Sequence, residues 1–393
     1  MKKLLKFLTF WIPVKKWRQK AREALRLFFM RFIPLKKNWV IFYDTFSKNG
    51  NGDSIRPVAE ELRRRRPDFK FFFVSKEMRS IDMADEVLIL GTQRYEQVLM
   101  RAKYVVSPMD LPASKRQGQI WIMTWHGTPL KKIYLSREDT PEFRNYVKPF
   151  HNIDVFCNSS LEHGKIYEEA LLVPSASIKN MGLPRNDILL QDSDNHIRNQ
   201  VRKKLGIPDD KKVLFYCPTW RRYDWKMPMP LDLNKLKREI GNEYCILLRS
   251  HVGKHDWVDE RGNKINIDDD GFTYDVRDYP NISELYLACD VLITDYSSSI
   301  FDFAITQKPQ ILFAYDLEDY RNEFKFYFDY ENFVPGPIAK KTGELILHIA
   351  NLKNYERKYG EQYQKFKETF CAYEDGHAAE RVVDYILEEK HNG

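Results

Sequence analysis

The side chains best suited to chemistry directly follow apolar runs of the sequence. His126 comes after the run 119–125 and before the turn Gly127–Pro129. A histidine there suits proton transfer, because its ordinary pKa of about 6.5 lies near neutral pH. A lone histidine is more often structural, but one between a strand end and a turn is the better candidate for function.

A second set of cations and hydroxyls follows apolar runs in the later half of the chain. Ser297–Ser299 come after Val291–Ile293 and before a helical pattern, so free backbone N–H groups would point at one spot. Asp302 lies four residues after Ser298, so both face that spot. Four strand ends would deliver to one rim the groups Thr219, Arg221, Arg249, His251 and Ser297–Ser299. Such a rim is typical of a phosphate site, and independently solvated loop residues are the alternative.

The elements that position these groups alternate between strands and helices. The expected strands are 39–43, 70–74, 86–90, 104–107, 119–125, 154–159, 212–217, 244–248, 272–276, 291–293 and 310–314. Helical patterns cover 57–66, 344–352 and 377–390. Alternation of this kind predicts parallel sheets, whose ligands bind beyond the C-terminal strand ends. We therefore expect an α/β protein with two Rossmann-like domains facing a cleft.

A polar, charged stretch divides the two series of strands. Residues 191–212 contain Pro208 and no long apolar run, which is typical of a domain junction. The expected division is an arm of residues 1–37, a first domain of residues 38–195 and a second domain of residues 196–393 that includes the closing helices.

The arm carries the basic charge of the chain. Residues 1–37 have a net charge of +11, so the remainder of this +7 chain has −4, and we expect no nucleic-acid partner. One helical face before Pro13 carries Leu4, Leu5, Leu8, Trp11 and Ile12. A basic amphipathic helix suits an anionic membrane surface, and a helix packed on its own domain is the alternative. The apolar runs are too short and too charged to span a bilayer.

Other sequence signals narrow the function classes. The five cysteines form no CxxC pair, which indicates reduced thiols and a cytosolic location. No GxGxxG follows the first strand and no Walker motif is present, so NTP hydrolysis is disfavoured. Asp268–Asp270 contains a DxD pattern, but it stands in a charged stretch before a weak strand. We expect no metal and no cofactor.

Several characteristic strings follow one another along the chain. In order, they are WHGTPLKK, GLPRND, CPTWRR, RSH, LITDYSSSIFDFA and YDLEDYR with FYFDYENFVPGPI. Together they resemble the CDP-glycerol glycerophosphotransferases of wall teichoic acid synthesis, a family of primases, polymerases and CDP-ribitol relatives. The resemblance runs from about residue 39 to residue 390. It implies a GT-B-like fold and a peripheral protein on the cytoplasmic face of the cell membrane, where the basic arm would attach.

The resemblance also implies roles for individual residues. His126 matches the family's proposed catalytic base, and Arg249 and His251 match the pair that contacts the donor phosphates, with His251 counted as catalytic. The substrate-binding residues implied by the matching strings are Trp125, Gly127, Thr128, Pro129, Arg185, Pro218, Thr219, Arg221, Arg249, Ser250, Asp295, Ser297, Ser298, Ser299 and Asp302. The loop Gly50–Pro57 departs from the family's Asp-Asn-Pro form, which affects the acceptor side more than the donor side.

The implied reaction transfers glycerol phosphate from CDP-glycerol to a hydroxyl group and releases CMP. The implied acceptor is an undecaprenyl-diphosphate-linked saccharide or a growing polyol-phosphate chain. A CDP-ribitol transferase, a GT-B nucleotide-sugar glycosyltransferase and a non-catalytic membrane-bound binder stay open as alternatives. Primase or polymerase action, wall polymer or capsule, and self-association are left open as well.

Overall fold

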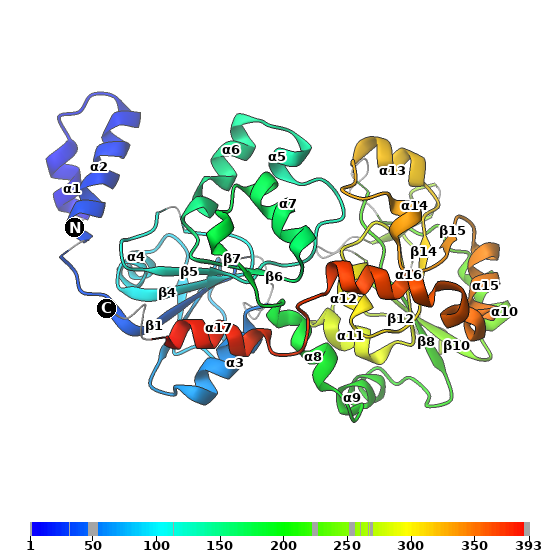
Figure 1. Ribbon diagram of the computed structural model, residues 1–393. Helices are drawn as coiled ribbons and strands as arrows, with labels where there is room; N and C mark the ends of the chain where they lie inside the picture. Colours follow the sequence, from blue (N-terminus) through cyan, green and yellow to red (C-terminus); the bar gives the residue numbers. More distant parts are fainter. Residues whose placement is uncertain are drawn as a thin grey trace. The chain divides into compact units, whose positions relative to one another are not determined.

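The computed structural model describes residues 2–30, 32–45, 54–112, 114–221, 227–250, 256–259, 261–265, 267 and 270–388 (Figure 1). By contact, the chain divides into two compact units. Unit 1 comprises residues 1–125, 149–156 and 382–393, and unit 2 comprises residues 126–148 and 157–381. The contact division places residues 126–148 and 157–195 in the same unit as the later strands. The domain boundary expected between residues 195 and 196 stays a prediction.

The first sheet has seven strands in the order β3-β2-β1-β4-β5-β6-β7. Their bounds are β1 Lys36–Tyr43, β2 Lys70–Ser75, β3 Glu86–Ile89, β4 Ala102–Ser107, β5 Ile120–Met123, β6 Val155–Asn158 and β7 Ile178–Asn180. Strands β1 to β6 pair in parallel. Their residues are largely buried on both faces, which explains why they read as continuous apolar runs in the sequence.

Besides the helices of the arm, three helices lie wholly or partly in unit 1. They are α3 (Arg56–Arg65), α4 (Gln93–Leu99) and the later part of α17 (Ala378–Leu387). Thr92 begins α4 as an N-cap, because its side chain accepts from the backbone N–H of Tyr95. The last turns of α17 return to unit 1, where the Tyr104 hydroxyl donates to the carbonyl of Ile386 over 2.8 Å.

The second sheet lies in unit 2 and has the strand order β12-β10-β8-β13-β14-β15. Its strands are β8 Lys212–Tyr216, β10 Tyr244–Leu248, β12 Thr273–Asp275, β13 Val291–Thr294, β14 Gln310–Phe313 and β15 Ile338–Ala339, and all of them pair in parallel. A two-stranded sheet joins β9 (Met227–Pro228) to β11 (Trp257–Val258). The expected α/β class with parallel sheets is confirmed.

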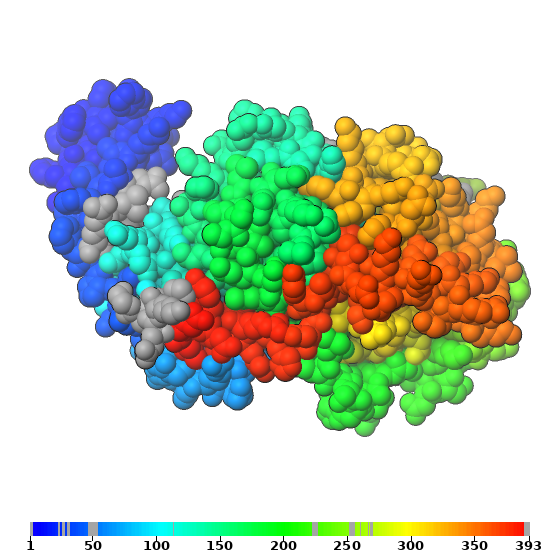
Figure 2. Space-filling view, viewed as in Figure 1, coloured from blue at the N-terminus to red at the C-terminus, as the bar shows by residue number. Residues whose placement is uncertain are grey.

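Unit 2 also contains α-helices, from α5 to α16 in chain order. Their bounds are α5 Tyr134–Arg137, α6 Pro141–Val147, α7 Leu161–Leu171, α8 Asp187–Gln191, α9 His196–Lys204, α10 Leu233–Ile240, α11 Ile282–Ala288, α12 Ser299–Ala304, α13 Leu317–Glu323, α14 Tyr330–Phe333, α15 Thr342–Ala350 and α16 Tyr355–Phe370. Figure 2 shows α7 (green) and α16 (orange-red) meeting on the surface of unit 2. Phe370 of α16 packs there on Phe301 of α12 and on His163 of α7.

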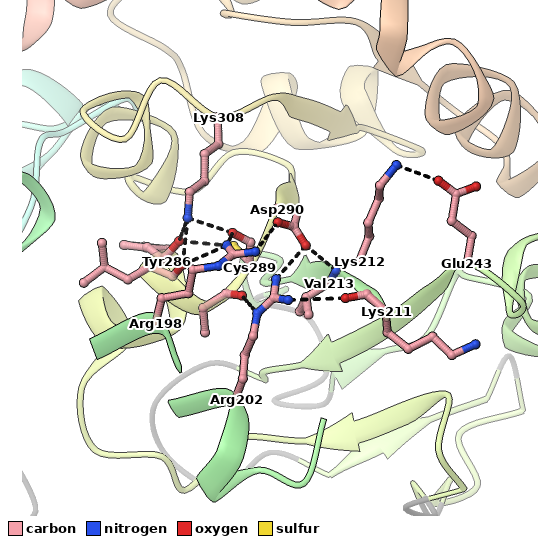
Figure 3. A network of polar contacts seen from close by, with 12 residues as sticks. Arg198, Arg202, Lys211, Lys212, Val213, Glu243, Tyr286, Cys289, Asp290 and Lys308 are labelled. Atoms are coloured by element: carbon pink, nitrogen blue, oxygen red, sulfur yellow. Dashed lines mark hydrogen bonds and ion pairs between the residues drawn. The ribbon is translucent and has the colours of Figure 1, made fainter. Parts of the chain in front are cut away.

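A network of polar contacts fixes the N-terminal edge of the second sheet (Figure 3). Asp290, just before β13, accepts from Arg198 at 2.8 Å, from Arg202 at 2.7 Å and from the backbone N–H of Val213 at 2.7 Å. Both arginines come from α9, inside the polar stretch expected to be a junction. The charges of that stretch therefore support the sheet of unit 2.

The arm forms two helices, α1 (Lys2–Thr9) and α2 (Lys15–Met30), with the break at Pro13 that the sequence predicts. Aromatic side chains of the arm remain on its surface: Phe7 in α1, Trp11 between the helices and Trp17 in α2 are each 69% exposed. Leu5, in contrast, is buried. Among the described residues, no helix has both the length and the apolar character needed to cross a bilayer.

Candidate functional site

The predicted cations and hydroxyls that the structure describes follow strands at one edge of the second sheet. Strands β10, β8, β13 and β14 are neighbours and run parallel, so their C-terminal ends lie side by side. The residues that begin one to three positions after these strands are Arg249–Ser250, Pro218–Thr219, Asp295–Ser299 and Asp316. A hydrogen bond of 2.8 Å from the backbone N–H of Thr219 to Asp295 joins two of these ends directly.

The backbone around His126 makes a sharp turn. Trp125 has φ of 60° and Gly127 has φ of 147°, two conformations in the region that L-residues rarely adopt. Trp125 is buried against Phe150, whereas His126 is exposed. The strained turn therefore presents His126 beyond the end of β5, between two buried neighbours.

Two residues from distant parts of unit 2 meet this turn. Arg185 donates from Nη1 to the backbone carbonyl of His126. A Cβ atom at Gly127 would lie 3.0 Å from Oγ of Ser298 and 4.0 Å from Nη1 of Arg185. Glycine is needed here because a side chain would press on Ser298. The loop of His126, the GLPRND loop and the start of α12 thus form one site.

A buried ion pair holds these segments together. Nη2 of Arg185 donates to Oδ2 of Asp302 over 2.8 Å, and the two side chains are 8% and 2% exposed. Asn186 donates to Oδ1 of the same carboxylate over 3.3 Å. Both oxygens of Asp302 thus accept from the GLPRND loop. The expected role of Asp302 in substrate binding stays a prediction.

A second acid supports the GLPRND loop from behind. The carboxyl oxygens of Glu374 each accept from the backbone N–H of Leu183 at 3.2 Å. Burial raises the pKa of Glu374 to about 8, so the group is mainly protonated at neutral pH. The prediction from sequence missed Glu374 and Asn186. The place of Asn186 beside Arg185 in GLPRND was a usable signal, whereas Glu374 is distant in sequence.

Arg221 and Asp295 are engaged with protein groups. Nη2 of Arg221 donates to Asp295 over 3.0 Å, and its Nε donates to Asp316 over 2.6 Å. Its Nη1 donates to the carbonyl of Thr219. Although burial alone would lower the pKa of Arg221, the two carboxylates hold it above its usual value. This network fixes the loop after β8, and direct substrate contact by Arg221 or Asp295 stays a prediction.

The end of β10 is anchored in a similar way. Nη1 of Arg249 donates to the carbonyls of Val276 at 3.0 Å and Tyr279 at 2.7 Å. In the described part of the chain, the buried hydroxyls of Thr219 and Ser250 have no hydrogen-bond partner. Two such hydroxyls at neighbouring strand ends are consistent with a site for a polar ligand. His251 lies outside the described residues.

The serine turn lies at the end of β13. Oγ of Ser297 and Oγ of Ser299 are 2.9 Å apart, and the backbone N–H of Ser299 donates to Ser297. Ser298 precedes α12 and makes no side-chain capping bond within that helix. Its hydroxyl faces Gly127 instead, which brings Ser298 to the turn of His126.

The family model described as CDP-Glycerol:Poly(glycerophosphate) glycerophosphotransferase matches residues 25–388. The chain belongs to this family. It is 33% identical over 376 residues to the teichoic acid poly(glycerol phosphate) polymerase of Bacillus subtilis (strain 168), covering 90% of this chain and 49% of the relative. The chain thus spans about half the length of that curated relative.

Solved structures show the same fold. The wall teichoic acid polymerase TagF, in a variant form, superposes with a TM-score of 0.83 and 27% identity over 96% of this chain and 97% of that chain. A further variant soaked with CDPG has a TM-score of 0.81 and 28% identity over 91% of this chain and 90% of that chain. The fold of this glycerophosphotransferase family member is therefore GT-B-like, as expected.

Two further charged residues of this glycerophosphotransferase family member, Lys131 and Asp270, pair with protein groups. Lys131, in the string WHGTPLKK, donates from Nζ to the Tyr320 hydroxyl over 3.2 Å, and burial lowers its pKa to about 8. The site prediction did not include it, although its motif was recognised. Of the DxD residues, Asp268 and Asp269 lie outside the described residues, and Asp270 pairs with Lys237 at 2.6 Å.

Proposed function

We propose that this protein transfers glycerol phosphate from CDP-glycerol to a hydroxyl of a membrane lipid-linked saccharide or a growing polyol-phosphate chain. The proposal rests on one observation: in a chain of this family, the turn of His126 and the serine turn after β13 lie in one site. There, the exposed His126 stands on a turn held by Arg185, and this turn meets Ser298 at the end of β13. CMP is the second product, and the reaction belongs to teichoic acid or related surface-polymer synthesis.

The proposed chemistry has one bond-forming and one bond-breaking event. The acceptor oxygen forms a bond to the β-phosphorus of CDP-glycerol while the bond from that phosphorus to the bridging oxygen breaks. His126 takes the proton of the acceptor hydroxyl, because an alcohol is a poor nucleophile near neutral pH. CMP leaves with the bonding electron pair as a phosphate of low basicity, so it needs charge stabilisation more than a proton.

Charge stabilisation in this proposal comes from the rim of the second sheet. Arg249 and His251 contact the diphosphate, and Ser297–Ser299 donate hydroxyl and backbone hydrogen bonds to phosphate oxygens. The unpaired hydroxyls of Thr219 and Ser250 at the described strand ends support this placement. Arg185 and Asp302 hold the turn of His126 in position.

Donor preference tests the proposal at the level of binding. Titration calorimetry of the full chain with CDP-glycerol, CDP-ribitol and a UDP-sugar should give the tightest binding for CDP-glycerol and the next for CDP-ribitol. Transfer from CDP-glycerol should also persist in EDTA, since we propose that protein cations neutralise the diphosphate. Preference for the UDP-sugar would instead support a glycosyltransferase.

Replacement of Ser298 by leucine is expected to weaken CDP-glycerol binding by at least about tenfold, the usual effect of losing one charge-assisted hydrogen bond. The longer side chain would also fill the space beside Gly127. Calorimetry measures the affinity and thermal unfolding checks the fold. Ser193→Leu, at an exposed loop position, is the matched control. Unchanged affinity in Ser298→Leu would remove this serine from the donor site.

Deletion of residues 1–30 is expected to release the protein from anionic vesicles, and binding of the full chain should fall as salt rises. The exposed aromatic side chains of α1 and α2, together with the arm's basic charge, support a peripheral position on the cytoplasmic face of the membrane. The deletion keeps Ile33, whose carbonyl accepts from Arg116. Vesicle sedimentation measures the effect, and equal sedimentation of both proteins would contradict the proposal.

A further inference from the structure

A polar cavity lies at the N-terminal ends of β4 and β5 in unit 1. Its volume is about 500 Å³, and its wall includes Lys103, Lys115, Arg116, Gln119, Asn152 and Asp154. Three of these side chains are cations and one is a carboxylate. The predicted donor and acceptor sites involve none of them, because they lie at the opposite ends of their strands from the turn of His126.

Lys103 is the most unusual residue of this cavity. It stands in β4 among buried residues and is itself 7% exposed. Among the residues that the structure describes, its ammonium group has neither a hydrogen-bond partner nor an ion-pair partner. Burial, and after it the neighbouring Lys37, lowers the pKa of Lys103, and Asp154 offsets only part of this effect. The stem of this side chain is buried, while its ammonium group opens on the cavity, where an anion can reach it.

The other two cations are fixed in place by the protein. Lys115 pairs with Asp154 and donates to the carbonyl of Asn152 over 2.8 Å. Arg116 is 8% exposed and is held by backbone carbonyls, those of Met100 at 2.7 Å and of Ile33. Its Nε has no hydrogen-bond partner in the described part of the chain, and no described carboxylate pairs with it. The cavity therefore has more positive charge than its own acid neutralises.

We propose that this cavity is a second anion site, which binds a phosphate group with Lys103 as its central ligand and Lys115 and Arg116 at its sides. Phosphate oxygens fit the site because they accept several charge-assisted hydrogen bonds at once. The volume suits a phosphate or diphosphate with a few attached atoms. This site is separate from the proposed transfer reaction and does not depend on it.

The cavity lies at the base of the arm. The carbonyl of Ile33 accepts from Arg116, and the backbone N–H of Lys36 donates to the carbonyl of Arg101 over 2.7 Å. Leu35 lies 3.1 Å from where a Cβ of Gly118 would stand, and Gly118 is part of the cavity wall. A phosphate there would come either from solution or from the headgroup of a lipid in the surface that the arm contacts. The ligand chemistry is the same in both cases.

Thermal unfolding of Lys103→Met with and without pyrophosphate tests the site. In buffer without phosphate, the variant should melt at or above the temperature of the unaltered protein, because a partly desolvated charge next to other cations is removed while the apolar stem is kept. Pyrophosphate should stabilise the unaltered protein by binding its folded state, with an apparent affinity at least about tenfold higher than that of the variant. Lys70→Met is the matched control, since Lys70 begins β2 and is exposed.

A second measurement identifies the source of the phosphate. The same proteins are sedimented with phosphatidylcholine vesicles that contain phosphatidic acid or, at equal total charge, phosphatidylglycerol. A tenfold loss for Lys103→Met on phosphatidic acid vesicles, without an effect of pyrophosphate, assigns a lipid phosphomonoester. A loss of pyrophosphate affinity in Lys103→Met, with unchanged sedimentation on phosphatidic acid vesicles, assigns a soluble phosphate.

Two results would overturn the proposal. One is that Lys103→Met and Lys70→Met have the same pyrophosphate affinity and the same vesicle sedimentation. The other is a lower melting temperature of Lys103→Met in phosphate-free buffer, since Lys103 would then already have a stabilising partner within the protein.

Discussion

Replacement of His126 by alanine is expected to lower the turnover number for glycerol phosphate transfer by about 10²- to 10⁴-fold, the usual range for loss of a general base. The effect should appear in kcat more than in the affinity for CDP-glycerol, because His126 acts on the acceptor hydroxyl. The exposed position of His126 on a strained turn makes the imidazole available for this role. Steady-state kinetics with purified full-length chain gives kcat, and calorimetry gives the donor affinity.

A histidine elsewhere on the same unit provides the control for this experiment. His196 is exposed on α9, where its ring contacts Gln200, so His196→Ala should leave kcat unchanged. His163 is unsuitable as a control because it is fully buried and packs on Phe370. Near-normal turnover in His126→Ala would contradict the assignment of the base.

Replacement of Arg185 by methionine is expected to lower the free energy of unfolding by about 3–5 kcal/mol, the usual result of removing one partner of a buried ion pair. The loss arises because the carboxylate of Asp302, 2% exposed, would keep its charge without its cation. Activity should fall as well, since Arg185 also holds the carbonyl of His126. Urea unfolding measures the stability of the purified variant.

A double-mutant cycle separates this pair from other effects of the change. Asp302→Asn removes the negative charge that Arg185→Met leaves without a partner. The double variant should therefore be more stable than the sum of the single changes predicts. Lys165→Met breaks an exposed ion pair with Glu162 in the same unit and should cost less than about 1 kcal/mol. A similar small cost for Arg185→Met would show that the pair does not hold the turn.

The sequence was informative about elements that depend on local pattern. Apolar runs predicted strand 244–248 with the observed bounds of β10, and the break of the arm at Pro13 also matched. The grouping of the strand-end cations and hydroxyls could be predicted because parallel neighbouring strands end at one edge. In agreement with this, a hydrogen bond joins Thr219, after β8, to Asp295, after β13.

Contacts between distant segments could not be predicted in this way. Arg198 and Arg202 lie in a charged stretch typical of a junction, yet both pair with Asp290. The sequence pattern predicts Arg221 to be a phosphate ligand at the sheet edge, but in the structure it forms ion pairs with Asp295 and Asp316. Nothing local to these arginines indicates a partner 74 to 95 residues away along the chain.

The identity of the nucleotide released from CDP-glycerol tests the central claim most directly. The full chain is incubated with CDP-glycerol and a lipid-linked saccharide acceptor, and both products are analysed by mass spectrometry. Attack on the β-phosphorus predicts CMP in equal amount to an acceptor that has gained glycerol phosphate, with little of either product from His126→Ala. Release of CDP with transfer of glycerol alone, or transfer from a UDP-sugar with CDP-glycerol inert, would contradict the account.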